Sequence, residues 1–126
     1  MPENPVEIRL IIPGAPEFLR LARLAAADAG SRAGLTYDEI EDLRIGTDEL
    51  CHSVMRPDGT GVVTLVFQLR DDGIVVAGEG PPLDSDREAK PSELSRTIVA
   101  AVVDQHELGR EGDSLRFRLF KRTHHR

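Results

Sequence analysis

Residues 36–54 read TYDEIEDLRIGTDELCHSV and carry the clearest secondary-structure signal in the chain. Thr36 and Glu39 have the T-x-x-E spacing of a capping box, in which each side chain bonds the other's exposed backbone N–H at the start of a helix. Apolar residues then recur at near-helical intervals, and Pro57-Asp58-Gly59 ends the pattern. The stretch therefore predicts an amphipathic helix with one buried face, formed by Ile40, Leu43, Leu50 and Val54.

The remaining segments alternate between strand-like and helix-like patterns. Apolar and polar residues alternate from Val6 to Leu10, and Pro16 suits the first turn of a helix because its missing N–H costs little there. The turn Asp71-Asp72-Gly73 separates two extended runs and predicts a hairpin. In chain order, we expect a strand over 6–12, a helix with core residues Phe18, Leu21, Ala22, Ala25 and Ala29, the helix described above, strands over 62–69 and 74–77, a loop over 78–91, a helix over 94–102 and a strand over 115–121.

This order of elements predicts the fold class. Helices gathered on one face of a mostly antiparallel sheet form a two-layer α+β sandwich. With 126 residues, the chain is expected to form a single domain over 1–126. The last strand should carry a basic face with Arg116, Arg118 and Lys121, and the tail from Lys121 to Arg126 is expected to be frayed.

Composition excludes several classes of function. A net charge of −6 disfavours direct nucleic-acid binding, which needs basic surface to displace counterions. No segment is apolar enough to span a membrane, and residues 1–12 lack the basic start and apolar run of a signal peptide. The single cysteine cannot form an internal disulfide. A cytoplasmic, reducing location is therefore the expectation.

The segment Thr47–Ser53, TDELCHS, holds several reactive side chains. Asp48 and His52 share a helical face, but zinc normally needs at least three protein ligands, and the other histidines (106, 124 and 125) have no paired spacing. Cys51 and His52 are adjacent, so their side chains diverge on a helix and make a poor nucleophile–base pair. We therefore expect no metal site, and we interpret Cys51 as a small buried hydrophobe.

Two quieter features are informative together. Glu49 and Ser53 lie one helical turn apart, and a glycine-rich stretch that begins Ala77-Gly78-Glu79-Gly80 follows a predicted strand. Glycines at Gly78 and Gly80 could let a ligand approach the backbone closely. Either feature alone is equally compatible with a solvated helix face or an ordinary turn.

With both features in place, the chain resembles the anti-sigma factor and serine-protein kinase family of bacterial partner-switching systems, the RsbW-like proteins of the GHKL ATPase superfamily. The resemblance is strongest over residues 31–51 and extends from Val6 to about Lys121. It implies the Bergerat-type, histidine-kinase-like ATPase sandwich and a site for ATP and magnesium between the helix layer and a lid. It also implies a homodimer that sequesters a sigma factor and phosphorylates an anti-anti-sigma antagonist on serine.

The sequence departs from that family at each nucleotide motif. In the helical E-x-x-x-N motif, Glu49 keeps the position that assists the attacking hydroxyl, but Ser53 replaces the asparagine that holds magnesium. In the D-x-G motif, Gly78 replaces the aspartate that reads adenine, while Gly80 is retained. The glycine-rich lid corresponds to residues 90–98, which contain no glycine. Because phosphoryl transfer depends on positioning and charge neutralisation, we expect ATP and magnesium binding to be weak or lost and kinase activity to be absent or marginal.

Partner binding need not be lost with catalysis. The resemblance implies that the first helix contributes to the partner surface, with Arg23 at the family's interacting arginine position and Arg20 beside it. The main hypothesis is an anti-sigma factor with a degenerate ATP site. Two alternatives stay open: an active ATP-dependent serine-protein kinase of the same family, and a non-catalytic regulatory or scaffold domain on this fold.

Overall fold

The computed structural model describes residues 6–84 and 91–124. These ranges contain β1 (Val6–Pro13), a short 3-10 helix η1 (Pro16–Phe18), α1 (Leu19–Arg32), α2 (Tyr37–Val54), β2 (Val62–Arg70), β3 (Gly73–Glu79), α3 (Glu93–Val102), β4 (Gln105–Glu111) and β5 (Ser114–Arg122).

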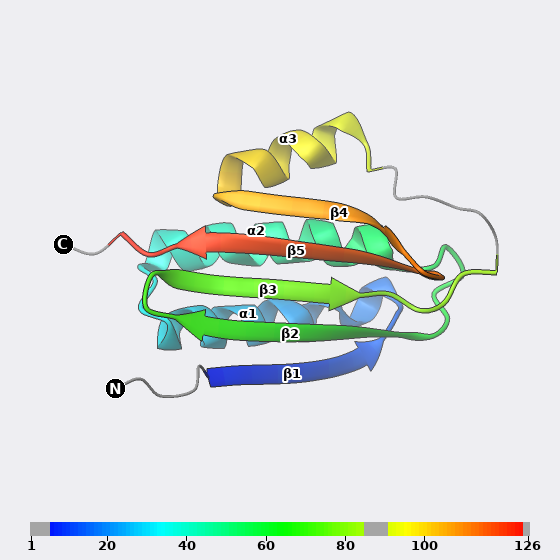
Figure 1. The fold of residues 1–126 in the computed structure, drawn as a ribbon, viewed down its shortest axis with the longest axis horizontal. Coiled ribbons are helices and arrows are strands. Elements are labelled where there is room, and N and C mark those ends of the chain that lie inside the picture. Colours follow the sequence, from blue (N-terminus) through cyan, green and yellow to red (C-terminus); the bar gives the residue numbers. More distant parts are fainter. Residues whose placement is uncertain (1–5, 85–90, 125–126) are drawn as a thin grey trace.

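A single antiparallel sheet and a helix layer make up the described part of the chain. The five strands lie in the order β1-β2-β3-β5-β4, and every neighbouring pair is antiparallel. Helices α1 and α2 cover one face of the sheet, while α3 lies beside the β4 edge (Figure 1). The predicted two-layer α+β sandwich is confirmed. In the described ranges, no helix is long and apolar enough to cross a membrane.

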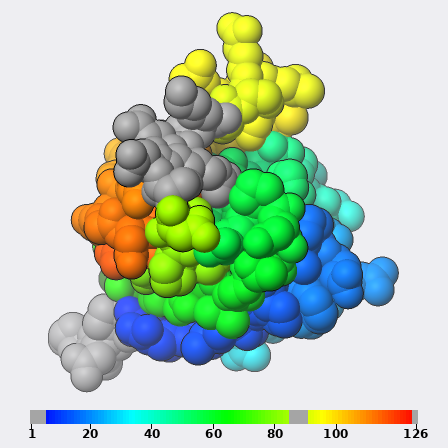
Figure 2. All heavy atoms as spheres, turned by 90° about the vertical axis from the view of Figure 1, so that its right-hand side faces the viewer, coloured from blue at the N-terminus to red at the C-terminus, as the bar shows by residue number. Residues whose placement is uncertain are grey.

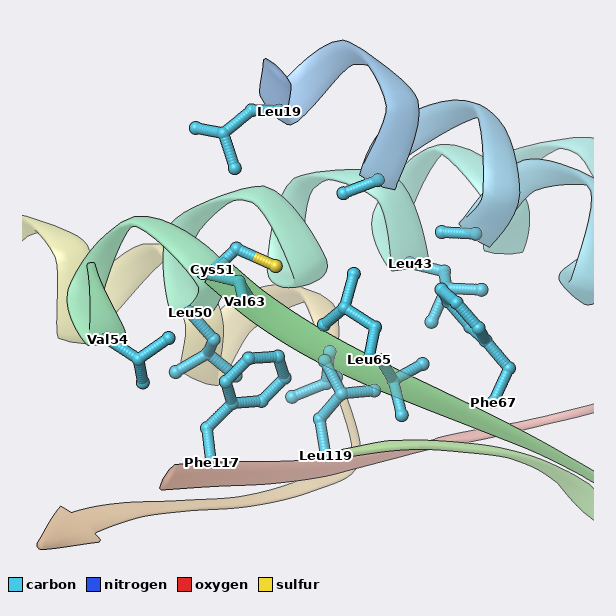
Figure 3. Close-up of a cluster of buried hydrophobic side chains, with 14 of the residues drawn as sticks. Leu19, Leu43, Leu50, Cys51, Val54, Val63, Leu65, Phe67, Phe117 and Leu119 are labelled. Carbon is cyan, nitrogen blue, oxygen red and sulfur yellow. The ribbon is translucent and has the colours of Figure 1, made fainter. Parts of the chain in front are cut away.

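The core lies between the helix layer and the sheet, and aliphatic residues and phenylalanine fill it. Leu43 and Cys51 of α2 meet Leu65, Phe67 and other side chains of the strands, all of them buried (Figure 3). Leu21, which was predicted to face the core, is instead 46% exposed, because it lies off the buried face of α1. Those buried α1 residues are Leu19, Ala22, Ala26, Ala29 and Gly30.

The start of α2 has the predicted capping box. The Glu39 N–H donates to Thr36 Oγ1 at 3.2 Å, and the Thr36 N–H donates to Glu39 Oε1 at 2.8 Å. Glu39 is buried and also accepts hydrogen bonds from the backbone and ring of His124. The capping residue therefore links the start of α2 to the end of β5.

Strand β4 and the end of the chain differ from the sequence prediction. Residues 105–111, QHELGRE, had no predicted structure because they show no apolar alternation, yet they form the edge strand β4 beside β5. The expected fraying from Lys121 onward is wrong for the described residues. Lys121 is buried and its Nζ lies 3.3 Å from Asp42, so it is not part of an exposed basic face, and the Thr123 N–H donates to Asp72 O. Residues 125 and 126 of the predicted frayed tail lie outside the described ranges.

At the end of the molecule seen in Figure 2, the segment after α2 and the segment after β3 lie side by side. Arg56 Nη1 donates to Pro82 O at 2.8 Å, and a Cβ at Gly61 would lie 2.4 Å from Pro81 Cβ. These contacts hold the chain where it leaves β3, next to the C-terminal end of α2.

Candidate functional site

Glu49 and Ser53 lie on the side of α2 that faces α3, and both are already engaged within the protein. Ser95 Oγ, from the first turns of α3, donates to Glu49 Oε1 at 2.8 Å. Ser53 Oγ donates to the backbone carbonyl of Glu49 at 3.0 Å. The Glu49 carboxylate thus accepts a hydrogen bond from a hydroxyl of another helix. The Ser53 hydroxyl donates to a backbone carbonyl one turn earlier in its own helix.

Gly78 lies inside β3 and not in a loop, because β3 continues to Glu79, two residues beyond the predicted end. It pairs with Phe117 of β5, and a Cβ added at Gly78 would lie 2.2 Å from Phe117 Cε2. The phenylalanine ring therefore occupies the space into which any side chain at position 78 would point. Phe117 is itself buried in the core (Figure 3).

Gly80 lies where the backbone after β3 passes close to the backbone at the end of α2. A Cβ there would lie 1.9 Å from the carbonyl oxygen of Val54, the last residue of α2. The Gly80 N–H donates to Leu115 O at 2.9 Å. The retained glycine therefore lets the end of β3 pass directly under the end of α2, which is a packing role that holds with or without a ligand.

The segment that matches the lid begins an ordinary helix where it is described. Ser92 is the N-cap of α3, and its Oγ accepts a hydrogen bond from the Ser95 N–H at 3.0 Å. Within residues 92–98, the Ser95 backbone amide at the start of α3 is therefore already bonded by the chain's own Ser92 side chain. Lys90, at the beginning of this segment, lies outside the described residues.

A hollow of about 330 Å³ adjoins the Glu49–Ser95 contact, between α3 and β4. This volume is at the low end for small-molecule sites. A larger hollow of about 520 Å³ lies on the face of the sheet that the helices do not cover. It surrounds the paired residues Ala77 and Arg118, whose side chains point to that face. The smaller hollow is lined by Leu50, Pro91, Ser95, Arg96, Val99, His106, Glu107 and Leu108.

Cys51 and His52 take different environments, as their spacing predicted. Cys51 is fully buried, and burial, followed by the nearby charge of Asp48, raises the pKa of its thiol far above the ordinary value. His52 is exposed. In the parts of the chain that the structure describes, no group of three or more His, Cys, Asp or Glu side chains could hold a metal ion. The thiol is therefore a core side chain.

The two arginines of α1 differ in their contacts. Arg23 Nη1 donates to Asp48 Oδ1 at 2.6 Å, which joins α1 to α2, and both side chains are about one third exposed. Arg20 is exposed on α1 and has no ion pair with a described residue. Sequence reasoning missed Asp48, Ser95 and Phe117 as neighbours of the predicted residues, because these contacts join separate elements and leave no local pattern.

Comparisons with known proteins agree with the resemblance. No protein-family model matches the chain. The chain is 34% identical over 111 residues to serine-protein kinase RsbW of Bacillus subtilis strain 168, an alignment that covers 83% of this chain and 68% of that protein. It is 32% identical over 124 residues to serine-protein kinase RsbW of Bacillus licheniformis, covering 93% of this chain and 76% of that protein. On this similarity, together with its α+β sandwich, the chain belongs to the RsbW serine-protein kinase family.

Proposed function

We propose that this protein is an anti-sigma factor that sequesters a sigma factor and binds an anti-anti-sigma antagonist in a bacterial partner-switching system, with a nucleotide site that no longer supports phosphoryl transfer. Membership of the RsbW family supports the first part. The packing of Phe117 against Gly78 carries the second.

Gly78 and its surroundings disfavour adenine binding for a steric as well as a chemical reason. The adenine-reading aspartate that the family resemblance implies at this position is absent, and the space for its side chain is filled by the Phe117 ring. A buried aromatic ring offers no hydrogen-bond acceptor to an adenine amino group. An unpaired polar group typically costs about 1–3 kcal/mol, so adenine recognition would be weakened at its main polar contact.

The metal and phosphate positions support the same conclusion. Ser53 Oγ donates a hydrogen bond to the Glu49 backbone carbonyl. The serine side chain is also shorter than that of asparagine, so its hydroxyl is a poorer magnesium ligand at this position than an amide oxygen. Glu49, the residue that would assist the attacking hydroxyl, accepts a hydrogen bond from Ser95. An incoming substrate would have to displace that contact before Glu49 could act.

For partner binding we propose the outer surface of α1, with Arg20 and Arg23. The Arg23 guanidinium is held by Asp48 through one nitrogen and is about one third exposed, so further N–H donors can reach a partner carboxylate. Leu24 is 59% exposed one turn after Arg20, which adds apolar area to the same surface. Arginine is one of the residue types that contribute most to binding energy at protein–protein interfaces.

Two measurements test the proposal. Isothermal titration with magnesium-ATP should give no micromolar binding, and purified protein with labelled ATP should not phosphorylate its cognate antagonist. In the same preparation, calorimetry should still detect binding to the sigma factor. Efficient phosphorylation would contradict the loss of catalysis, whereas loss of sigma-factor binding would contradict the anti-sigma role.

An active kinase is the second candidate. The retention of Glu49 and the hollow beside it favour this alternative. Magnesium-dependent ATP binding in the micromolar range, together with turnover that disappears in Glu49→Gln, would establish it in place of the main proposal.

A further inference from the structure

The hollow beside Glu49 opens along a free sheet edge. We call it the α3–β4 groove and define it by the lining residues Leu50, Pro91, Ser95, Arg96, Val99, His106, Glu107 and Leu108. Helix α3 runs beside β4, which is the outermost strand on this side of the sheet (Figure 1). The groove therefore has a helix as one wall and an edge strand as the other.

The strand wall has unused backbone groups. Strand β4 pairs with β5 on one side only, so alternate N–H and C=O groups along its other edge are left out of the ladder. In the described ranges, residues 106–109 make no backbone hydrogen bond outside the β4–β5 ladder. Such an edge is a template for an additional strand.

The side chains of the groove have a definite chemistry. Leu50 and Val99 are buried at its floor, and Leu108 is half-buried beside them. The Arg96 side chain is exposed at the rim and makes no ion pair or hydrogen bond with a described residue. The His106 imidazole lies on the opposite wall. Glu107 is the one carboxylate in the lining. The apolar floor of the groove could therefore contact an aliphatic side chain of a ligand. Arg96 at the rim could bind a carboxylate.

We propose that the α3–β4 groove binds an extended peptide segment of a partner protein by adding a strand to β4. Backbone hydrogen bonds to the free edge would supply affinity, and the side-chain pockets would supply specificity, as in other recognition by strand addition. The segment would place one bulky aliphatic residue on Leu50, Val99 and Leu108, and an acidic residue near Arg96. Guanidinium groups favour carboxylates because they bind them with two parallel hydrogen bonds.

This proposal concerns a different surface from the α1 face that carries Arg20 and Arg23. It therefore does not depend on sigma-factor binding. A peptide bound in the groove would also lie against Ser95, whose hydroxyl donates to Glu49, and would therefore add to the contacts that join α3 to α2.

A library of random octapeptides displayed on phage provides the probe. Selection on the wild-type protein should enrich peptides that combine an acidic and an aliphatic residue, and a labelled copy of the best peptide should bind in fluorescence anisotropy. Arg96→Glu and, separately, His106→Glu should each weaken that binding at least tenfold. Arg70→Glu, the same charge change at an exposed arginine outside the groove, should leave Kd unchanged.

Hydrogen exchange distinguishes strand addition from simple adhesion. The peptide should slow exchange of alternate β4 amides, which the free protein leaves outside the ladder. Circular dichroism should show that all three variants are folded. Failure to enrich any peptide, equal binding by Arg96→Glu and Arg70→Glu, or bound peptide that leaves β4 exchange unchanged would each overturn the proposal.

Discussion

Phe117 and Gly78 face each other across β5 and β3, and the phenylalanine ring takes the place of the missing side chain. In the RsbW-like pattern this position carries the aspartate that reads adenine. Here the same position is part of the hydrophobic core, with Leu50 and Leu119 also buried nearby (Figure 3). Under the proposed function, the nucleotide site would thus have lost both a polar group and the space for its side chain.

The first prediction concerns this contact. Gly78→Ala should lower the free energy of unfolding by about 1–3 kcal/mol, because the new Cβ would overlap the Phe117 ring and force both strands to shift. Urea denaturation followed by circular dichroism measures the change. Gly109→Ala is the matched control, since a Cβ there has no neighbour within 4 Å. Its effect should stay within about 0.5 kcal/mol. Equal stability of Gly78→Ala and wild type would show that the packing is loose.

Prediction from sequence succeeded where the signal was local. The α2 helix followed from the Thr36–Glu39 capping box, and its core face followed from residue spacing. Strand β4 was missed because its charged residues lack alternation, and only its hairpin with β5 places it in the sheet. The predicted start of the following loop at Gly78 was two residues too early, since pairing with β5 keeps Gly78 and Glu79 in β3. Local patterns report local structure, whereas edge strands depend on their neighbours.

The same limit applies to the candidate site. Glu49, Ser53, Gly78 and Gly80 were singled out from the sequence, but the partners of Glu49, Gly78 and Gly80 lie on other elements. Ser95 is 46 residues from Glu49, and no pattern near either residue indicates the contact. These long-range contacts, on which the proposed loss of ATP binding rests, come from the packing of α3 on α2 and of β5 against β3.

The second prediction separates stability from nucleotide binding. Ser95→Ala removes the hydroxyl that bonds Glu49 and should lower the free energy of unfolding by about 0.5–1.5 kcal/mol. It should not create magnesium-ATP binding in calorimetry, because Phe117 still fills the position next to Gly78. Thr97→Ala, at an exposed position of the same helix, is the control. Micromolar ATP binding by Ser95→Ala would mean that the Ser95 contact, and not the core packing, keeps the site closed.

The third prediction concerns the partner surface. Arg23→Glu should weaken sigma-factor binding at least tenfold in calorimetry, because it replaces the partly exposed guanidinium and places a carboxylate beside Asp48. Asp48→Asn should change the free energy of unfolding by less than about 1 kcal/mol, as expected for an ion pair that is one third exposed. Arg32→Glu, at the far end of α1, is the control for charge. Unchanged affinity of Arg23→Glu would remove α1 from the partner surface.

The last prediction concerns acid stability through Glu39. Burial alone would raise the pKa of this carboxyl, but hydrogen bonds from the Thr36 N–H and the His124 ring outweigh it and hold the pKa below its ordinary value. A carboxyl whose pKa is lower in the folded state stabilises the fold above its unfolded pKa of about 4.3. That contribution is lost as pH falls through the folded pKa.

Glu39→Gln tests this directly, because glutamine can still serve in a capping box while the charge is removed. At pH 7 the variant should be less stable than wild type by about 1–3 kcal/mol, and the difference should shrink between pH 5 and pH 3 as the wild-type carboxyl becomes protonated. Urea midpoints across that range measure it, with the exposed Glu17→Gln as control. A difference that stays constant with pH would mean that Glu39 contributes through its shape and neutral hydrogen bonds, and that its charge does not stabilise the link between α2 and the end of β5.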